Sequence, residues 1–366
     1  MKIALVTRRY PPLIGGAEKV LSYLAEAFAD AGAEVSVLTS RLDPTLPALE
    51  RPRPRLEIVR LPTSPVRILG TWIHMTAIQR WLARHPVDLA YVSMMKHDAY
   101  ATLGAGAKRG FPVVLRPEGA GATGDVAWQK WGRFGSRIAA RCRTATAYTA
   151  ISSAVRDELE ADGYPSERIV DIPNGVPMPE TAWVPPEQPR RAVYVGRLAR
   201  EKGLDVLIES WRRVVERAPD ARLRLVGDGP IRGELEALTE EVGLDESVEF
   251  AGAKPDASSD LAAGDLFVLP SREEGMSIAL LEAMALGIPV AATSIPGNRR
   301  LIEPGEHGRL AAVDDPIDLA DTILASWSDP AGSARMGRAA RERVRAEFSI
   351  ERVARVHLEF FERLIR

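Results

Sequence analysis

The chain has 366 residues, of which 46% are hydrophobic and 27% charged. This length predicts about two domains, and the composition is that of a globular protein rather than a disordered, collagen-like or coiled-coil chain. The net charge of −2 hides an asymmetry, because residues 1–150 hold 21 Lys and Arg against 11 Asp and Glu, a net charge of +10. The first part of the chain is therefore suited to an anionic partner, unless this charge is ordinary solvated surface.

No segment has the pattern of a membrane span or an export signal. The most apolar stretch, 276–298, contains Glu282 and Pro289, and the apolar run after Met1 is too short for a signal peptide. Cys142 is the only cysteine, so neither an internal disulfide nor a multi-cysteine metal site is expected. We expect a cytoplasmic protein. If it binds lipid, we expect it to be a peripheral protein at the inner face of the membrane.

In the first half of the chain, strand-like and helical segments alternate. A strand at 2–7 is followed by a turn at 11–16, a helix with apolar residues from Val20 to Phe28, and a strand at 35–38. This βαβ pattern predicts an open parallel sheet with helices on both faces. Further strands are predicted at 56–61, 89–92, 113–115 and 147–151.

Six prolines in 173–189 predict a stiff linker, after which the strand and helix pattern restarts. We therefore predict an α/β protein of two doubly wound Rossmann-like domains facing across a cleft, 1–172 and 190–347, with 348–366 as a terminal amphipathic helix. The second domain is predicted to contain strands at 192–195, 222–226, 247–251, 266–269 and 289–292, and helices at 203–217, 231–242 and 277–286.

Glu274 and Glu282 are the clearest candidates for a ligand site. Glu274 lies in the turn after the strand at 266–269, and Glu282 lies on the following, otherwise apolar helix. A carboxylate there needs polar partners, and ribose hydroxyls are suitable donors, although two solvated surface glutamates are the simpler alternative. The backbone amides at this helix N-terminus suit a phosphate; they belong to Gly275, Met276 and Ser277.

Arg197 and Lys202 follow the first strand of the second domain and bracket a turn where a diphosphate could rest. The turn at 225–230, LVGDGP, is typical of a structural turn. The sequence contains no Asp-x-Asp, and hence no evident carboxylate pair for a metal ion. We therefore expect cationic side chains and backbone amides to neutralise a bound diphosphate without a metal ion.

Taken in chain order, these motifs resemble those of retaining nucleotide-sugar glycosyltransferases of the GT-B fold, the large family with two glutamates separated by seven residues. The resemblance covers nearly the whole chain and is weakest at 41–86. The motifs are GGAE (15–18), IPNGV (172–176), VGRLAREKG (195–203), LVGDGP (225–230), FAG (250–252) and EEGMSIALLEAMALGIPVAAT (273–293).

The resemblance implies a role for each of these residues. Arg197 and Lys202 would hold the diphosphate. Glu274 would bind the hydroxyls of the donor sugar, and Glu282 those of the ribose. Donor contacts through the backbone are implied at Gly15 and Gly16, for the phosphate, and near Gly252, for the base.

One position departs from the family pattern. The loop after the strand at 113–115 often carries a histidine in this family, but here Glu118 takes that place, and none of the five histidines occupies it. A carboxylate at this position is expected either to stabilise an oxocarbenium-like transition state or to bind the acceptor hydroxyl.

The resemblance implies a retaining hexosyltransferase that moves a sugar from a nucleoside diphosphate, UDP or GDP, to a hydroxyl of a glycan or lipid-linked saccharide. No cofactor, metal or nucleic acid is expected. A nucleotide-sugar epimerase of the same fold and a non-catalytic nucleotide-sugar binding protein are alternatives. A dehydrogenase is disfavoured: 119–124 matches G-x-G-x-x-G, but no acidic residue follows about twenty residues later.

Residues 128–143 are expected to form one basic amphipathic helix. Such a helix suits an anionic lipid surface, but it could equally be an internal helix that packs on the sheet with solvated arginines. It contains five basic residues, Arg143 and four that recur at spacings of three and four, Lys130, Arg133, Arg137 and Arg141; its apolar stripe is Trp131, Phe134, Ile138 and Cys142.

Overall fold

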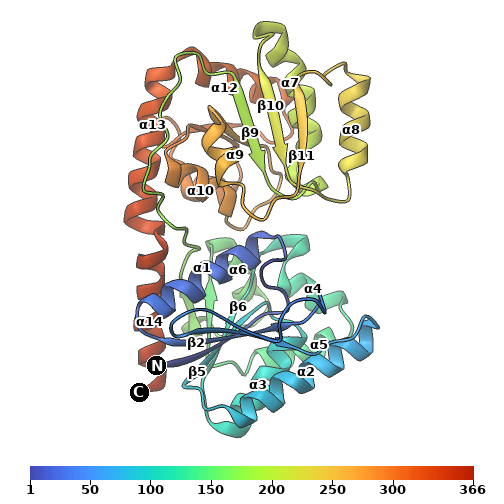
Figure 1. Cartoon of the computed structure of the whole chain (residues 1–366), viewed down its shortest axis with the longest axis vertical. Coiled ribbons are helices and arrows are strands. Elements are labelled where there is room, and N and C mark those ends of the chain that lie inside the picture. The colour runs from blue at the N-terminus through green and yellow to red at the C-terminus, as the bar shows by residue number, and fades with distance from the viewer. The chain divides into compact units, whose positions relative to one another are not determined.

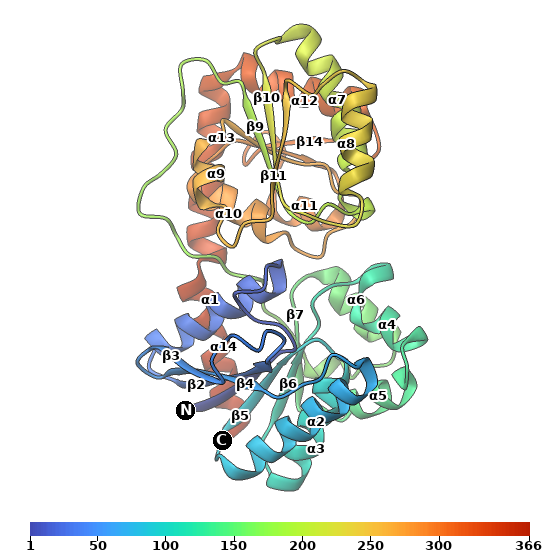
Figure 2. The same ribbon diagram turned by 45° about the vertical axis from the view of Figure 1, so that its right-hand side comes forward.

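The computed structural model describes residues 1–366, apart from the side chains of Arg67 and Thr123, and divides into two compact units. The first unit comprises Met1–Leu13, Ala17–Gly175 and Ile350–Arg366, and the second comprises Ile14–Gly16 and Val176–Ser349. Each unit has one sheet with helices on both faces (Figures 1 and 2). The prediction of two Rossmann-like α/β domains is confirmed. Among the described residues, no helix is both long and apolar enough to cross a membrane.

The sheet of the first unit has the strand order β3-β4-β2-β1-β5-β6-β7-β8. All neighbouring strands are parallel except β3, which forms an antiparallel edge with β4. The sequence analysis missed β3 because its residues, LERPR, are polar and include a proline, as edge strands tolerate. The strands are β1 (Lys2–Val6), β2 (Glu34–Ser40), β3 (Leu49–Arg53), β4 (Leu56–Leu61), β5 (Leu89–Ser93), β6 (Val113–Arg116), β7 (Ala147–Ala150) and β8 (Ile169–Asp171).

The helices of the first unit correct one expectation, the single helix at 128–143. The chain instead forms α4 and α5 with a break between them, because Phe134 adopts a left-handed conformation with φ 60°. The expected apolar stripe is split: Trp131 and Phe134 are 72% and 55% exposed, whereas Ile138 and Cys142 are buried. The helices are α1 (Gly16–Asp30), α2 (Arg67–Arg84), α3 (His97–Arg109), α4 (Asp125–Trp131), α5 (Gly135–Cys142), α6 (Ser153–Ala161) and α14 (Ile350–Ile365).

The sheet of the second unit is entirely parallel, with the order β11-β10-β9-β12-β13-β14. The first strand of the unit, β9, lies between β10 and β12, so the order reverses there and the loops after β9 and β12 leave the same edge side by side. The strands are β9 (Arg191–Val195), β10 (Arg222–Val226), β11 (Val248–Gly252), β12 (Leu266–Leu269), β13 (Val290–Thr293) and β14 (Arg309–Ala311).

Among the helices of the second unit, α10 is buried on nearly all sides, which explains why its sequence is apolar apart from Glu282. It packs against β12 and β13 and against α13. The buried Arg341 of α13 donates to the carbonyl oxygens of Ala285 and of Pro179, so it ties α13 to α10 and to the proline-rich segment. The helices are α7 (Leu204–Arg217), α8 (Arg232–Glu241), α9 (Ser258–Ala263), α10 (Ile278–Leu286), α11 (Pro296–Leu301), α12 (Pro316–Ser328) and α13 (Pro330–Arg343).

The last helix of the chain, α14, completes the core of the first unit. The ring of Phe361 lies 5.8 Å from that of Phe28 on α1 and 5.2 Å from that of Tyr91 on β5. The buried His357 accepts a hydrogen bond at Nε2 from the Tyr91 hydroxyl, over 2.9 Å, while its Nδ1–H donates to the carbonyl of Val353, over 2.8 Å. The neutral imidazole with its proton on Nδ1 satisfies both ring nitrogens.

We predict that His357 makes folding stability depend on pH. Burial, reinforced by the charge of Arg116, lowers the pKa of His357 from 6.5 to about 3. The unfolded chain therefore binds a proton here that the folded chain excludes, and folding loses about 2 kcal/mol from this residue between pH 7 and pH 5. Urea unfolding should show this loss in the wild type. The loss should be smaller by about this amount in His357→Gln, which retains an acceptor for the Tyr91 hydroxyl. If the free energy of unfolding fell equally with pH in the variant and the wild type, the assignment to His357 would be wrong.

Candidate functional site

The turns after β9, β10 and β11 in the second unit are locked together by backbone hydrogen bonds. Gly196 N–H donates to Val226 over 3.0 Å, and Gly227 N–H donates to Gly252 over 2.9 Å. Gly227 has φ 153°, and a Cβ there would lie 1.8 Å from the Gly196 carbonyl oxygen, so only glycine fits. The LVGDGP motif thus has a structural role: it fixes the turn that carries Arg197.

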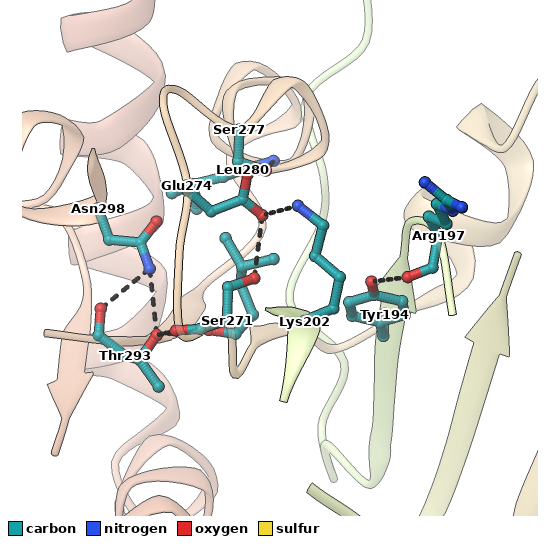
Figure 3. Close-up of polar contacts among 10 residues, drawn as sticks. Tyr194, Arg197, Lys202, Ser271, Glu274, Ser277, Leu280, Thr293 and Asn298 are labelled. Carbon is teal, nitrogen blue, oxygen red and sulfur yellow. Dashed lines mark hydrogen bonds and ion pairs between the residues drawn. The ribbon is translucent and has the colours of Figure 1, made fainter. Parts of the chain in front are cut away.

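Lys202 is brought to the neighbouring turn by a close approach of two loops. It ends the 3₁₀ turn η3 (Arg200–Lys202), and the next residue, Gly203, has φ 63°. A Cβ on Gly203 would lie 2.2 Å from the carbonyl oxygen of Pro270, which follows β12. The ammonium Nζ of Lys202 therefore reaches Glu274 Oε1, 2.8 Å away, and Figure 3 shows the two side chains converging.

Glu274 is held in place by buried polar residues at the ends of β12 and β13. The Ser271 hydroxyl donates to Glu274 Oε1 over 2.9 Å, and the Ser271 carbonyl accepts from Thr293 Oγ1 over 2.5 Å. Asn298 Nδ2 in turn donates to the Thr293 carbonyl over 2.9 Å (Figure 3). Sequence reasoning missed Ser271, Thr293 and Asn298. Ser271 and Thr293 could have been found as polar residues just after predicted buried strands, whereas Asn298 lies on α11 and has no such signal.

Arg197 differs from Lys202 in that it is exposed and uncommitted. The Tyr194 hydroxyl donates to its carbonyl oxygen over 3.0 Å, and in Figure 3 its guanidinium points away from Glu274. No carboxylate of the described residues lies within 4 Å of this guanidinium. Lys202 is 21% exposed, and its ammonium has three N–H donors, so it can keep Glu274 and still donate to an anion. At this edge of the sheet, Arg197 thus offers a planar guanidinium that can donate two parallel hydrogen bonds, and Lys202 offers a compact positive charge.

The structure also locates the other residues predicted for donor binding. Ser277 caps α10, since its hydroxyl accepts from Leu280 N–H over 3.3 Å. Glu282 is partly buried on α10 and has interactions of its own. Gly275 and Met276 lie in the segment between Glu274 and α10, Gly252 ends β11 with φ 75°, Gly15 precedes α1, and Gly16 is its first residue.

A hollow of about 630 Å³ lies beside these turns, but its charge does not suit a diphosphate. Of the charged residues that line it, two are basic and four acidic. Both arginines are paired: Arg272 with Asp205 at 2.7 Å and Arg200 with Glu234 at 2.7 Å. The candidate anion site is therefore formed by Arg197 and Lys202 rather than by this larger hollow.

Glu118, in the first unit, is engaged with a buried cation. Its carboxylate pairs with Arg116, which is 2% exposed, and accepts a hydrogen bond from the Ser93 hydroxyl. Arg116 Nη2 also donates to Asn174 Oδ1 over 2.5 Å. Burial opposes the charge of Arg116, but Glu118 and Tyr91 outweigh it and raise its pKa above the usual value. Glu118 therefore serves first as the counter-charge of Arg116.

The loops after β5 and β6 are joined by a buried carboxylate that the sequence analysis did not single out. Asp125 Oδ1 accepts from Met95 N–H over 3.1 Å, and its Oδ2 accepts from Glu118 N–H over 2.9 Å. Burial raises the pKa of Asp125 above its usual value, although Lys96 and the two amides oppose this shift. This arrangement fixes Ser93, Glu118 and the start of α3 relative to one another.

A cavity of about 320 Å³ opens at the carboxyl ends of β1 and β5 in the first unit. Its lining includes Ser93, His97 and three cations, Arg8, Arg9 and Lys96. Burial lowers the pKa of His97, and Arg8 and Lys96 lower it further against the opposing effect of Asp98. His97 therefore presents a neutral imidazole at pH 7. The sequence analysis counted His97 but gave it no role; it lies five residues after the predicted strand at 89–92 and begins α3.

No metal cluster is apparent in the part of the chain that the structure describes: no three or more His, Cys, Asp or Glu side chains are grouped so as to hold an ion.

Comparisons with known proteins agree with this architecture. Residues 189–329 match the family model for glycosyl transferases group 1, and residues 14–178 match glycosyltransferase family 4. The putative colanic acid biosynthesis glycosyltransferase WcaL of Escherichia coli is 35% identical over 54% of this chain and 52% of its own length. The chain spans about half the length of the first curated relatives it matches.

Two solved structures show the same fold over the whole chain. Sucrose-phosphate synthase from Thermosynechococcus elongatus superposes with a TM-score of 0.85 at 24% identity, covering 99% of this chain and 98% of its own. Anabaena HepE in complex with UDP-glucose superposes with a TM-score of 0.81 at 20% identity, covering 99% of each chain. With both family models matched in sequence and the same fold throughout, the chain belongs to the GT-B glycosyltransferases.

Proposed function

We propose that the chain is a cytoplasmic enzyme that transfers a sugar from a nucleoside diphosphate, UDP or GDP, to a hydroxyl acceptor, with retention of configuration and without a metal ion. The observation that carries the proposal is the Lys202–Glu274 ion pair, with the uncommitted Arg197 on the adjacent turn. It is supported by the structure of HepE in complex with UDP-glucose and by the similarity to WcaL, a putative colanic acid biosynthesis glycosyltransferase. A glycan or lipid-linked saccharide is the proposed acceptor.

In this proposal the second unit activates the leaving group. As the bond from the sugar to the diphosphate breaks, negative charge grows on the diphosphate, and Arg197 and Lys202 stabilise this charge more strongly than that of the bound donor. Glu274, fixed beside Lys202, is placed to accept hydrogen bonds from hydroxyls of the donor sugar. Glu282 accepts from the ribose hydroxyls, and the amides from Gly275 to Ser277 add donors at the N-terminus of α10.

The first unit has no side chain dedicated to nucleophilic attack in this scheme. The acceptor hydroxyl attacks from the face that the diphosphate leaves, so the diphosphate itself is available to take the proton. Because the Glu118 carboxylate already pairs with Arg116 and Ser93, we assign Glu118 a positioning role in place of direct stabilisation of the transition state. The neutral His97 imidazole is able to donate one hydrogen bond to a bound sugar.

The proposal predicts that nucleotide-sugar turnover requires an acceptor and persists in excess EDTA. UDP- and GDP-sugars would be incubated with the protein and with lipid or glycan acceptors, and nucleoside diphosphate release and the product's anomeric configuration would be measured. Acceptor-independent conversion of the donor would instead favour the epimerase alternative. Tight donor binding with no turnover on any acceptor would favour the binding-protein alternative, and loss of activity in EDTA would refute metal independence.

Removal of either diphosphate-binding cation is predicted to slow turnover strongly. Arg197→Ala and Lys202→Ala should each lower kcat on the order of 10²-fold, by analogy with the loss of one oxyanion donor. Arg200→Ala is the matched control, because Arg200 lies in the same loop but its side chain pairs with Glu234 at the surface. The assignment fails if both variants, with normal melting temperatures, remain within a few-fold of wild type.

Glu282 is predicted to control nucleotide affinity through the ribose. Calorimetric titration with UDP and with GDP should show weaker binding in Glu282→Gln, which keeps the size of the side chain, and still weaker binding in Glu282→Ala. The wild type should bind a 2′-deoxynucleotide less tightly than the ribonucleotide. The two variants should bind both nucleotides with about equal affinity. Unchanged nucleotide affinity in Glu282→Ala would place the ribose elsewhere.

A further inference from the structure

The segment that leads into α2 exposes four large apolar side chains that nothing in the first unit covers. Val66, Ile68, Leu69 and Trp72 are 60%, 61%, 47% and 64% exposed. Ile68, Leu69 and Trp72 fall on one face of the helix, given its spacing of 100° per residue. Gly70 lies buried on the opposite side, where its backbone approaches the Ser64 carbonyl so closely that a Cβ would lie 2.1 Å from that oxygen. The fold therefore holds this face outward.

A second exposed apolar site lies where α4 ends and α5 begins. Trp131 and Phe134 are 72% and 55% exposed, and the break at Phe134 directs both away from the core that Ile138 and Cys142 enter. Arg133 and Arg137 beside them are also exposed, and Lys130 is 67% exposed. Basic side chains thus accompany this apolar site.

Both apolar sites adjoin the cavity of the first unit. Thr71, next to Trp72, lines the cavity together with Lys96 and His97. The His97 ring lies 5.4 Å from the ring of Trp128, which in turn lies 6.2 Å from that of Trp131. The two exposed apolar sites thus each connect to the cavity, one through Thr71 and the other through Trp128, and together we call them the apolar rim: Val66, Ile68, Leu69, Trp72, Trp131 and Phe134.

The cavity itself has a net positive charge. Arg8, Arg9 and Lys96 face two carboxylates, and Arg9 is paired with one of them, Glu18, at 2.8 Å. Arg8 Nη1 lies 3.9 Å from the other, Asp98. The Lys96 ammonium stacks over the Trp128 ring at 5.4 Å, and within the described residues no carboxylate lies within 4 Å of it. Lys96 is thus available to an anionic group that enters from the rim.

We propose that the apolar rim docks on an anionic lipid surface and that the cavity receives the phosphate-bearing head group of a lipid acceptor. The lipid is the occupant we favour because an apolar surface flanked by exposed basic residues matches the two layers of an anionic membrane interface. The assignment of a lipid acceptor rests on the proposed glycosyltransferase function, whereas the assignment of a membrane contact does not depend on it.

The test compares two double variants on vesicles. Wild type should cosediment with vesicles of about one third anionic lipid at low salt. Ile68→Gln/Trp72→Ala should weaken this binding more than tenfold. Lys96→Gln/Arg133→Gln should weaken it about 25-fold on anionic vesicles, at about fivefold per charge, and leave binding to zwitterionic vesicles unchanged.

Matched controls come from exposed residues of the second unit. Val184→Gln/Ile317→Gln removes two apolar side chains that are 77% and 49% exposed, and Arg212→Gln/Arg217→Gln removes two exposed charges; both should bind vesicles like wild type. Failure of wild type to bind anionic vesicles, or equal loss in the controls, would overturn the docking surface. If, without vesicle binding, the α2 variant converts a dimer to a monomer in ultracentrifugation, the rim is a contact between copies of this chain.

A soluble short-chain phosphatidylglycerol separates the cavity from the rim. Its binding should fall about fivefold in Lys96→Gln and remain unchanged in Arg133→Gln. Equal affinity in both variants would refute the head-group site. UDP and GDP titration of the same samples tests the two proposals separately. Vesicle binding without nucleotide binding would support the membrane contact and refute the acceptor assignment. Nucleotide binding without vesicle binding would refute the membrane contact but leave the glycosyltransferase proposal standing.

Discussion

The candidate site depends on the ion pair between Lys202 and Glu274, and this pair depends on sheet topology. β9 and β12 are neighbours although 70 residues separate them in sequence, so the loops that follow them meet at one edge. The pair is only partly exposed, which strengthens its Coulomb attraction relative to that of a surface pair. Without Glu274, Lys202 would lose the contact that fixes its ammonium. Without Lys202, a carboxylate would lie where a diphosphate is expected.

A second buried charge organises the first unit in a related way. Arg116 is nearly inaccessible and has two partners in different segments, Glu118 and Asn174. Removing one partner of such a group leaves an uncompensated buried charge, which is strongly destabilising. Hence Glu118 is constrained by Arg116 as well as by any ligand. At the cavity of this unit, the neutral imidazole is that of His97 at the start of α3.

The sequence predicted most strands of both sheets, because their apolar runs are short and bounded by glycine and proline. It missed β3 and the break between α4 and α5, which depend on tertiary contacts and on one left-handed residue rather than on periodicity. Lys202 and Glu274 could be predicted individually from their positions after strands. Their pairing, and its support by Ser271, Thr293 and Asn298, could not, because hydrogen bonds between distant loops leave no local pattern.

The position of α14 also affects how the protein is made. The first unit begins at Met1, yet its core includes Phe361 and its buried hydrogen bonds include one between Tyr91 and His357. During synthesis the ribosome must therefore release almost the entire chain before this unit can close, whereas Val176–Ser349 is available earlier. Until then, the surface around Phe28 and Tyr91 is open to chaperones. The unit whose first strand is translated earliest can thus be completed only after its last helix, α14, has been translated.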